Sequence, residues 1–89
     1  MTADTVVGII GSGAMGAGIA QVAAMAGHDV VLYDNKAAML EKARSSLATL
    51  LQKRQDKGKI ESADTVLRRF SFAPLMSSLS GCGLIIEAI

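Results

Sequence analysis

The chain has 89 residues, of which 51% are hydrophobic, and its formal net charge at pH 7 is +1. This length suits one small domain, and the weak charge without a long run of like charges argues against a disordered tail or a general nucleic-acid binder. No basic region precedes an apolar core at the N-terminus, and glycines and polar residues interrupt the apolar stretches, so the sequence indicates no signal peptide or membrane span. We expect a cytoplasmic protein with neither nucleic-acid nor membrane partners.

The single cysteine, Cys82, has no second thiol with which to form an internal disulfide and no histidine at metal-ligand spacing. This usage fits a reducing compartment, and we expect Cys82 to be a small buried apolar residue. The sequence predicts no metal site.

In chain order, the first predicted element is an apolar strand over residues 6–10, bounded by Gly11 and covered on both faces. A helix of small residues and Met follows over residues 14–26, and Gly27 occupies the position of a C-terminal helix glycine. Residues 29–34, "DVVLYD", predict a second strand. Together these elements have the length of one right-handed strand–helix–strand crossover.

A long helix is predicted from Lys36 to about Lys57, with Asn35 as a possible cap and Gly58 at its end. Its apolar residues recur at intervals of three and four, which predicts one buried face. They are Met39, Leu40, Ala43, Leu47, Leu50 and Leu51.

The remaining elements are a short helix within residues 61–70, a brief third strand at residues 70–73, a helix starting at Pro74 and a fourth strand at residues 84–88. The alternation of strands and helices predicts an α/β fold, a Rossmann-type doubly wound parallel sheet with partial strand order 3-2-1-4. In that order the carboxyl ends of the first and fourth strands form the crevice where ligands bind. The ending "GLIIEAI" resembles a buried strand without a cap, so we expect an N-terminal piece of a longer protein.

Three glycines between the first strand and the first helix match the pattern G-x-G-x-x-G. Gly11 would permit the tight turn, Gly13 would let a pyrophosphate approach the backbone, and Gly16 would let helix and strand pack closely. The free N–H groups of the first helical turn would then face the phosphates. The pattern alone is equally compatible with close packing of a small-residue helix on a strand.

Asp34 favours the dinucleotide interpretation, because it ends the second strand about 20 residues after the glycines, where a carboxylate accepts hydrogen bonds from the adenosine ribose. It would repel the 2′-phosphate of NADP, and Asn35 is not the arginine that would compensate, so NAD is favoured. The flexible Lys36 ammonium could still swing toward a 2′-phosphate, so this residue leaves NADP open. A phosphate-binding loop of the triphosphatase type is excluded, since Ala17 and Gly18 replace its lysine and hydroxyl residue.

The run "IIGSGAMGAGIAQVAAMAGHDVVLYD" resembles the N-terminal segment of the 3-hydroxyacyl-CoA dehydrogenase family, and "KGKI" and "LIIEAI" resemble family segments at the expected separations. The resemblance covers nearly the whole chain. It implies that residues 1–89 are the N-terminal part of an NAD-binding Rossmann domain, without the C-terminal helical substrate and dimerisation domain. The parent protein would be a homodimeric oxidoreductase that interconverts 3-hydroxyacyl-CoA and 3-oxoacyl-CoA with NAD, as in fatty-acid β-oxidation.

By position, the resemblance assigns the pyrophosphate and adenosine ribose to Gly11, Gly13, Gly16 and Asp34, with backbone N–H groups from Ala14 and Met15. It assigns the nicotinamide side to Glu87 and Ala88, and the CoA moiety to Lys53 and Lys57. The two lysines could equally be a solvated helix end that suits the negative end of the helix dipole. One departure is Gly83, where the family usually has an aspartate before the strand.

The resemblance implies that the catalytic histidine and its carboxylate partner lie beyond residue 89, so no catalytic residue is expected in this chain. We expect His28, the only histidine, to be a solvent-exposed turn residue at the far end of the sheet from the glycines. Two other functions stay open: a Rossmann dehydrogenase of a small hydroxy acid without CoA, and a non-catalytic NAD-sensing module. We also expect the apolar fourth strand to promote association of the isolated chain.

Overall fold

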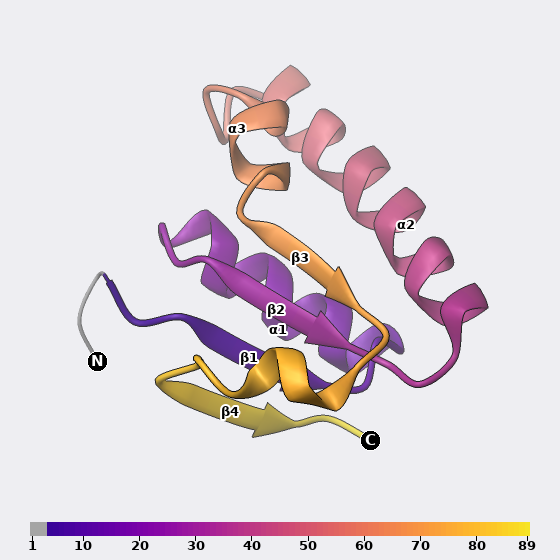
Figure 1. Ribbon diagram of the computed structural model, residues 1–89. Helices are drawn as coiled ribbons and strands as arrows, with labels where there is room; N and C mark the ends of the chain where they lie inside the picture. The colour runs from indigo at the N-terminus through magenta and orange to yellow at the C-terminus, as the bar shows by residue number, and fades with distance from the viewer. Residues whose placement is uncertain (1–3) are drawn as a thin grey trace.

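Four parallel strands form a single sheet in the order β3-β2-β1-β4 (Figure 1). The computed structural model describes residues 4–89. The strands are β1 (Val7–Ile10), β2 (Val30–Tyr33), β3 (Phe70–Ala73) and β4 (Leu84–Glu87). The predicted α/β class and the predicted strand order are therefore confirmed.

The helices α1, α2 and α3 lie on one side of the sheet, whereas the connection from β3 to β4 crosses the other side (Figure 1). Their bounds are α1 (Ala14–Met25), α2 (Ala37–Asp56) and α3 (Ala63–Leu67), and the crossing segment contains a 3₁₀ helix, η1 (Met76–Leu79). The connections that follow β1 and those that lead to β4 therefore lie on opposite sides of the sheet. Between these two strands the strand order changes direction, and a crevice forms at their carboxyl ends.

The strand register aligns the carboxyl ends of β1, β2 and β4. Ile10 pairs with Tyr33 of β2 and with Glu87 of β4, each being the last residue of its strand. Because all the strands are parallel, the residues that follow them meet at one edge of the sheet.

The hydrophobic core lies between the sheet and the helical layer, and its largest fully buried side chains come from β1, β2 and α2. They are Val7, Ile9, Val30, Leu32, Leu47 and Leu51. Helix α1 contributes only small buried residues, Gly16, Ala20 and Ala24, so its backbone can lie close to the strands. This close approach places the beginning of α1 directly beside the end of β1.

The other side of β1 is shaped by Gly8. A Cβ atom added to Gly8 would lie 2.8 Å from Cys82 Sγ and 2.9 Å from Leu79 Cδ2. The bare backbone of Gly8 therefore accommodates the segment that crosses from β3 to β4. Cys82 is partly rather than fully buried, and this burial raises the pKa of its thiol.

Both long helices end as predicted. Gly27 follows the C-cap of α1 with φ of 103°, and Gly58 follows that of α2 with φ of 74°, a region that favours glycine. The prediction that Asn35 caps α2 was wrong, because the N-cap is Lys36 and it makes no side-chain cap. The 3₁₀ helix begins two residues after Pro74, since Leu75 is still extended.

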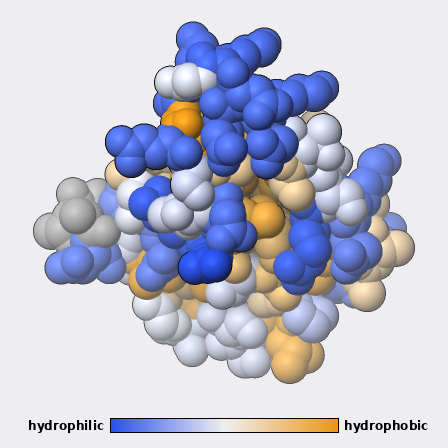
Figure 2. All heavy atoms as spheres, turned by 90° about the horizontal axis from the view of Figure 1, so that it is seen from above, coloured by the Kyte–Doolittle hydropathy of each residue, from blue (hydrophilic) through white to orange (hydrophobic). Residues whose placement is uncertain are grey.

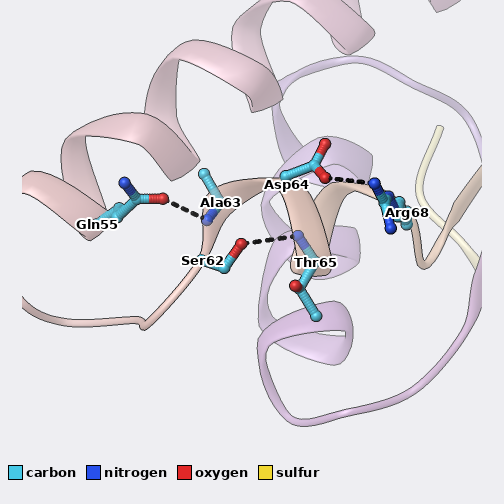
Figure 3. Close-up of polar contacts among 6 residues, drawn as sticks. All are labelled: Gln55, Ser62, Ala63, Asp64, Thr65 and Arg68. Carbon is cyan, nitrogen blue, oxygen red and sulfur yellow. Dashed lines mark hydrogen bonds and ion pairs between the residues drawn. The ribbon is translucent and has the colours of Figure 1, made fainter.

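The first turn of helix α3 is held by side-chain contacts, one of which comes from α2 (Figure 3). Ser62 Oγ accepts a hydrogen bond from the Thr65 N–H at 3.2 Å, and Gln55 Oε1 accepts one from the Ala63 N–H at 2.8 Å. An exposed ion pair between Asp64 and Arg68 spans the helix. These contacts satisfy N-terminal donors of a helix too short to be stable alone.

The expectation that His28 is solvent-exposed was wrong. His28 is only 8% exposed, and its Nδ1–H donates to the Thr5 carbonyl at 3.0 Å. Strand β4 has the sequence of a buried strand, but it is a sheet edge here, with Leu84 41% and Ile85 49% exposed, as expected for the isolated chain.

Candidate functional site

The turn between β1 and α1 depends on three glycines, each for a different reason. Gly11 has φ of 104°, and a Cβ there would lie 2.8 Å from the Ala88 carbonyl oxygen. A Cβ on Gly16 would collide with the Gly11 carbonyl oxygen. No atom lies within 4 Å of the position of a Cβ on Gly13, so the space above this residue is free.

The start of α1 presents backbone donors to that space. The first hydrogen bond within the helix runs from the Ala17 N–H to the Gly13 carbonyl, and the N-cap Gly13 has no side chain to cap the helix. The N–H groups of Ala14, Met15 and Gly16 therefore have no partner within the helix. With the positive end of the helix dipole they form a favourable place for an anion.

Asp34, at the end of β2, lies against the glycine turn. Its Oδ2 atom accepts hydrogen bonds from the Ser12 N–H at 3.0 Å and from the Ser12 hydroxyl at 2.9 Å. Its Oδ1 atom accepts a hydrogen bond from the Lys36 N–H at 3.0 Å. The carboxylate thus joins the end of β2 to the loop that follows β1.

These contacts keep Asp34 ionised. The backbone N–H groups of Ser12 and Lys36 lower the pKa of the carboxyl most strongly. Burial opposes them, and the Ser12 hydroxyl and the Lys36 ammonium lower the pKa further by smaller amounts. A charged acceptor is therefore held at the mouth of the crevice.

A cleft of about 500 Å³ joins these features at the carboxyl ends of the strands. Its lining includes Gly11, Gly13, Asp34, Lys36 and Ala88. Asp34 and Lys36 are the only charged residues among those that line it. Its volume lies within the range of small-molecule sites.

The two residues expected on the nicotinamide side differ in position. Ala88 is 8% exposed, and its N–H donates to the Ile10 carbonyl at 2.8 Å, which holds the end of β4 beside Gly11. Glu87 is exposed at the end of β4 and does not line the cleft.

The two lysines expected to contact CoA lie away from the cleft. Lys53 is in the last turn of α2 and Lys57 is its C-cap, and both side chains are exposed. At 1.5 Å per residue, Lys53 lies roughly 25 Å along α2 from its beginning near Asp34. Figure 2, which views the molecule from above, shows hydrophilic residues gathered over the upper part of the view. A shallow polar groove on α2 includes Lys53 but not Lys57.

Sequence reasoning missed Ser12, which is 4% exposed and donates to Asp34 through both its backbone and its side chain. Ser12 lies between Gly11 and Gly13, at a position where the G-x-G-x-x-G pattern specifies no residue type, so the pattern did not indicate this role. The partner lies 22 residues away, so only the paired strands bring the two residues together.

Within residues 4–89 no group of three or more His, Cys, Asp or Glu side chains is arranged to hold a metal ion. Over the same part of the chain, no helix has the length and apolar character needed to cross a membrane.

The strand order, the glycine turn and the carboxylate at the end of β2 define a Rossmann-type dinucleotide-binding domain. Residues 6–89 match the family model described as "3-hydroxyacyl-CoA dehydrogenase, NAD binding domain". The chain therefore belongs to the 3-hydroxyacyl-CoA dehydrogenase family, as its NAD-binding domain.

Curated relatives and solved structures agree with this assignment. The chain is 43% identical over 83 residues to a probable 3-hydroxybutyryl-CoA dehydrogenase of Deinococcus radiodurans, covering 92% of this chain and 30% of the relative. It is 42% identical over 84 residues to the 3-hydroxyadipyl-CoA dehydrogenase of Escherichia coli K12, covering 92% and 18%. The crystal structure of the (S)-3-hydroxybutyryl-CoA dehydrogenase from Ralstonia eutropha matches with a TM-score of 0.88 at 32% identity, covering 96% and 31%.

The chain thus spans less than a third of the length of these relatives.

Proposed function

We propose that NAD lies across the cleft at the carboxyl ends of β1, β2 and β4, with its pyrophosphate over the glycine turn. The free space above Gly13, next to the N–H groups of Ala14 and Met15, is the observation that carries this proposal. Gly11 and Gly16 act by keeping the turn compact, and the first-turn N–H groups act as hydrogen-bond donors to the phosphates. No basic side chain is needed for this.

In the same proposal the Asp34 carboxylate accepts hydrogen bonds from the hydroxyls of the adenosine ribose. Its ionised state makes it a strong acceptor for a diol and a poor neighbour for a 2′-phosphate. NAD is therefore preferred over NADP. The Lys36 ammonium, which lines the same cleft, reduces this repulsion.

Bound NAD supplies a nicotinamide ring that exchanges a hydride with the carbon bearing the substrate hydroxyl. Ala88 follows β4, the strand next to β1, and lines the cleft on the side where the ring would be held, whereas Glu87 ends β4 just outside the cleft lining. The end of β4 forms one wall and holds the ring by packing. His28 does not move the hydroxyl proton in this proposal, since it is buried at the opposite end of β2 from Asp34.

At the level of the whole protein, we propose an NAD-dependent 3-hydroxyacyl-CoA dehydrogenase of which residues 1–89 are the N-terminal part. The relatives named above are dehydrogenases of 3-hydroxybutyryl-CoA and 3-hydroxyadipyl-CoA, which supports an acyl-CoA substrate. The catalytic base and a helical domain for substrate binding and dimerisation belong to the rest of that protein.

Lys53 and Lys57 are proposed to hold the phosphates of CoA. Their separation from the cleft along α2 suits a long substrate that reaches the nicotinamide with its acyl end. The hydroxyls of Ser45, Ser46 and Thr49 line the polar groove that contains Lys53, and they can donate further hydrogen bonds to a phosphate or an amide.

A pair of glycine substitutions tests the pyrophosphate site. Gly13→Ala and Gly18→Ala each place a methyl group where no atom lies within 4 Å, so neither should disturb the fold. Only the methyl at Gly13 would occupy the phosphate position, and we expect Gly13→Ala to weaken NAD binding by tenfold or more (~1.4 kcal/mol). Gly18→Ala should leave the affinity measured by calorimetry unchanged. Equal NAD affinity in both variants would refute the site.

A further inference from the structure

Ser12 is the buried polar residue of the site to which the NAD assignment gives no role. The residue is 4% exposed, so its hydroxyl is shielded from competition by water. The hydroxyl donates to Asp34 Oδ2 at 2.9 Å, the same oxygen that accepts from the Ser12 N–H at 3.0 Å. A buried residue thus directs two donors at one carboxylate oxygen.

The other carboxylate oxygen is held independently. Oδ1 accepts from the Lys36 N–H at 3.0 Å, so donors from two different loops fix the two oxygens of Asp34. The Lys36 N–H and the Ser12 N–H are main-chain groups that any residue at these positions would supply. The Ser12 hydroxyl is the one side-chain donor among the three, and it distinguishes serine from alanine at this position.

Without the hydroxyl, Oδ2 would keep one donor and the carboxylate would be freer to rotate about its Cβ–Cγ bond. The charged Lys36 side chain lines the same cleft and would compete for it. The ribose hydroxyls need an acceptor in a fixed direction, because they are themselves fixed by the ribose ring. Preorganised acceptors avoid an ordering penalty on binding.

We propose that Ser12 is a positioning residue of the adenosine-ribose site: its side-chain hydroxyl holds the Asp34 carboxylate in the orientation that accepts the ribose diol. This inference rests on the proposed role of Asp34. Ser12 then contributes to the affinity for the ribose diol and does not contribute to the affinity for the pyrophosphate. The lowered pKa of Asp34, to which the Ser12 hydroxyl contributes, agrees with this arrangement.

The test compares Ser12→Ala with Ser12→Thr, which keeps the hydroxyl, and with Ser62→Ala as a matched control. Ser62→Ala also removes one hydroxyl, from the N-cap of α3, and should lower stability without reaching the cleft. Calorimetric titration with NAD should show about tenfold weaker binding for Ser12→Ala, the size expected for a lost hydrogen bond to a charged group. Ser12→Thr should recover most of the affinity, and Ser62→Ala should bind as the parent does.

A second titration uses the NAD analogue with a 2′-deoxyadenosine ribose. If Ser12 acts through the diol, Ser12→Ala should weaken binding of the analogue by less than it weakens binding of NAD. The carboxyl resonance of Asp34, followed by carbon-detected NMR, should titrate at a higher pH in Ser12→Ala. An equal loss of affinity for NAD and for the analogue, or an unchanged Asp34 titration, would overturn the inference.

Asp34→Ala separates failure of this inference from failure of the proposed function. If Asp34→Ala weakens NAD binding and Ser12→Ala does not, the positioning role is wrong and the ribose site stands. If neither change weakens NAD binding, the assignment of the ribose to Asp34 is wrong, and the role of Ser12 is wrong with it.

Discussion

Gly16 packs directly against the carbonyl oxygen of Gly11, so closely that no side chain fits between helix α1 and the end of strand β1. Both partners are backbone, and neither can move aside as the end of a flexible side chain would. The contact sets where the N-terminus of α1 lies relative to the strand. It also fixes where the free N–H groups of α1 point.

We therefore expect Gly16→Ala to be strongly destabilising. The added methyl must displace α1 or the turn, and the free energy of unfolding should fall by about 3 kcal/mol or more. Gly18→Ala on the same helix has free space and should be neutral or stabilising by up to about 1 kcal/mol. Urea denaturation of the two variants compares them, and similar midpoints would mean that the contact is not a constraint in solution.

The stability of the protein should depend on pH through Asp34. Because the folded state lowers the pKa of this carboxyl, its contribution is fully present above the unfolded value of about 4 and is lost as the pH falls through the folded value. Lys36 is the charged group that shares its cleft. Asp34→Asn should weaken the decline in unfolding free energy below about pH 4, as measured by denaturant titrations between neutral and acidic pH. An unchanged slope would show that Asp34 is not held by these bonds.

The two lysines at the end of α2 give a test of the substrate. In the whole protein, Lys53→Ala with Lys57→Ala should raise KM for an acyl-CoA severalfold and leave NAD affinity unchanged, because both lie far from the cleft. Lys42→Ala, another exposed lysine on α2, is the matched control. No change in KM would favour a substrate without CoA.

The exposed edge of β4 predicts self-association of the 89-residue chain. Unpaired strand edges with apolar side chains template further pairing, and a lysine there opposes it. Ile85→Lys should reduce association measured by analytical ultracentrifugation, whereas Ser71→Lys, on the opposite edge strand β3, should not. A monomeric parent chain, or an equal effect of both lysines, would contradict this account.

Much of the fold could be predicted because its signals are local. The apolar run of β1, the spacing of apolar residues in α2, and Gly27 and Gly58 after the helices each act over a few residues. The strand order followed from the alternation of elements and from connection rules. The outline of the site was predictable for the same reason, since the glycines and Asp34 stand at fixed distances from strand ends.

What could not be predicted depends on contacts between distant segments. The bonds from Ser12 to Asp34 require the register of β1 with β2. The burial of His28 requires the Thr5 carbonyl, 23 residues earlier. Asn35 is a residue type that often caps helices, yet the N-cap of α2 is the next residue, Lys36. Residue type alone does not fix the position at which a helix begins.

The missing side chain of Gly8 has a consequence for the width of the cleft. Leu79 and Cys82 rest on the bare backbone at Gly8, and the same segment leads into β4, which ends with Ala88 against Gly11. A larger residue at position 8 would push this segment outward and shift the far wall of the cleft. We therefore expect Gly8, which is buried and out of reach of a bound nucleotide, to set the width of the nucleotide cleft through the packing of this segment.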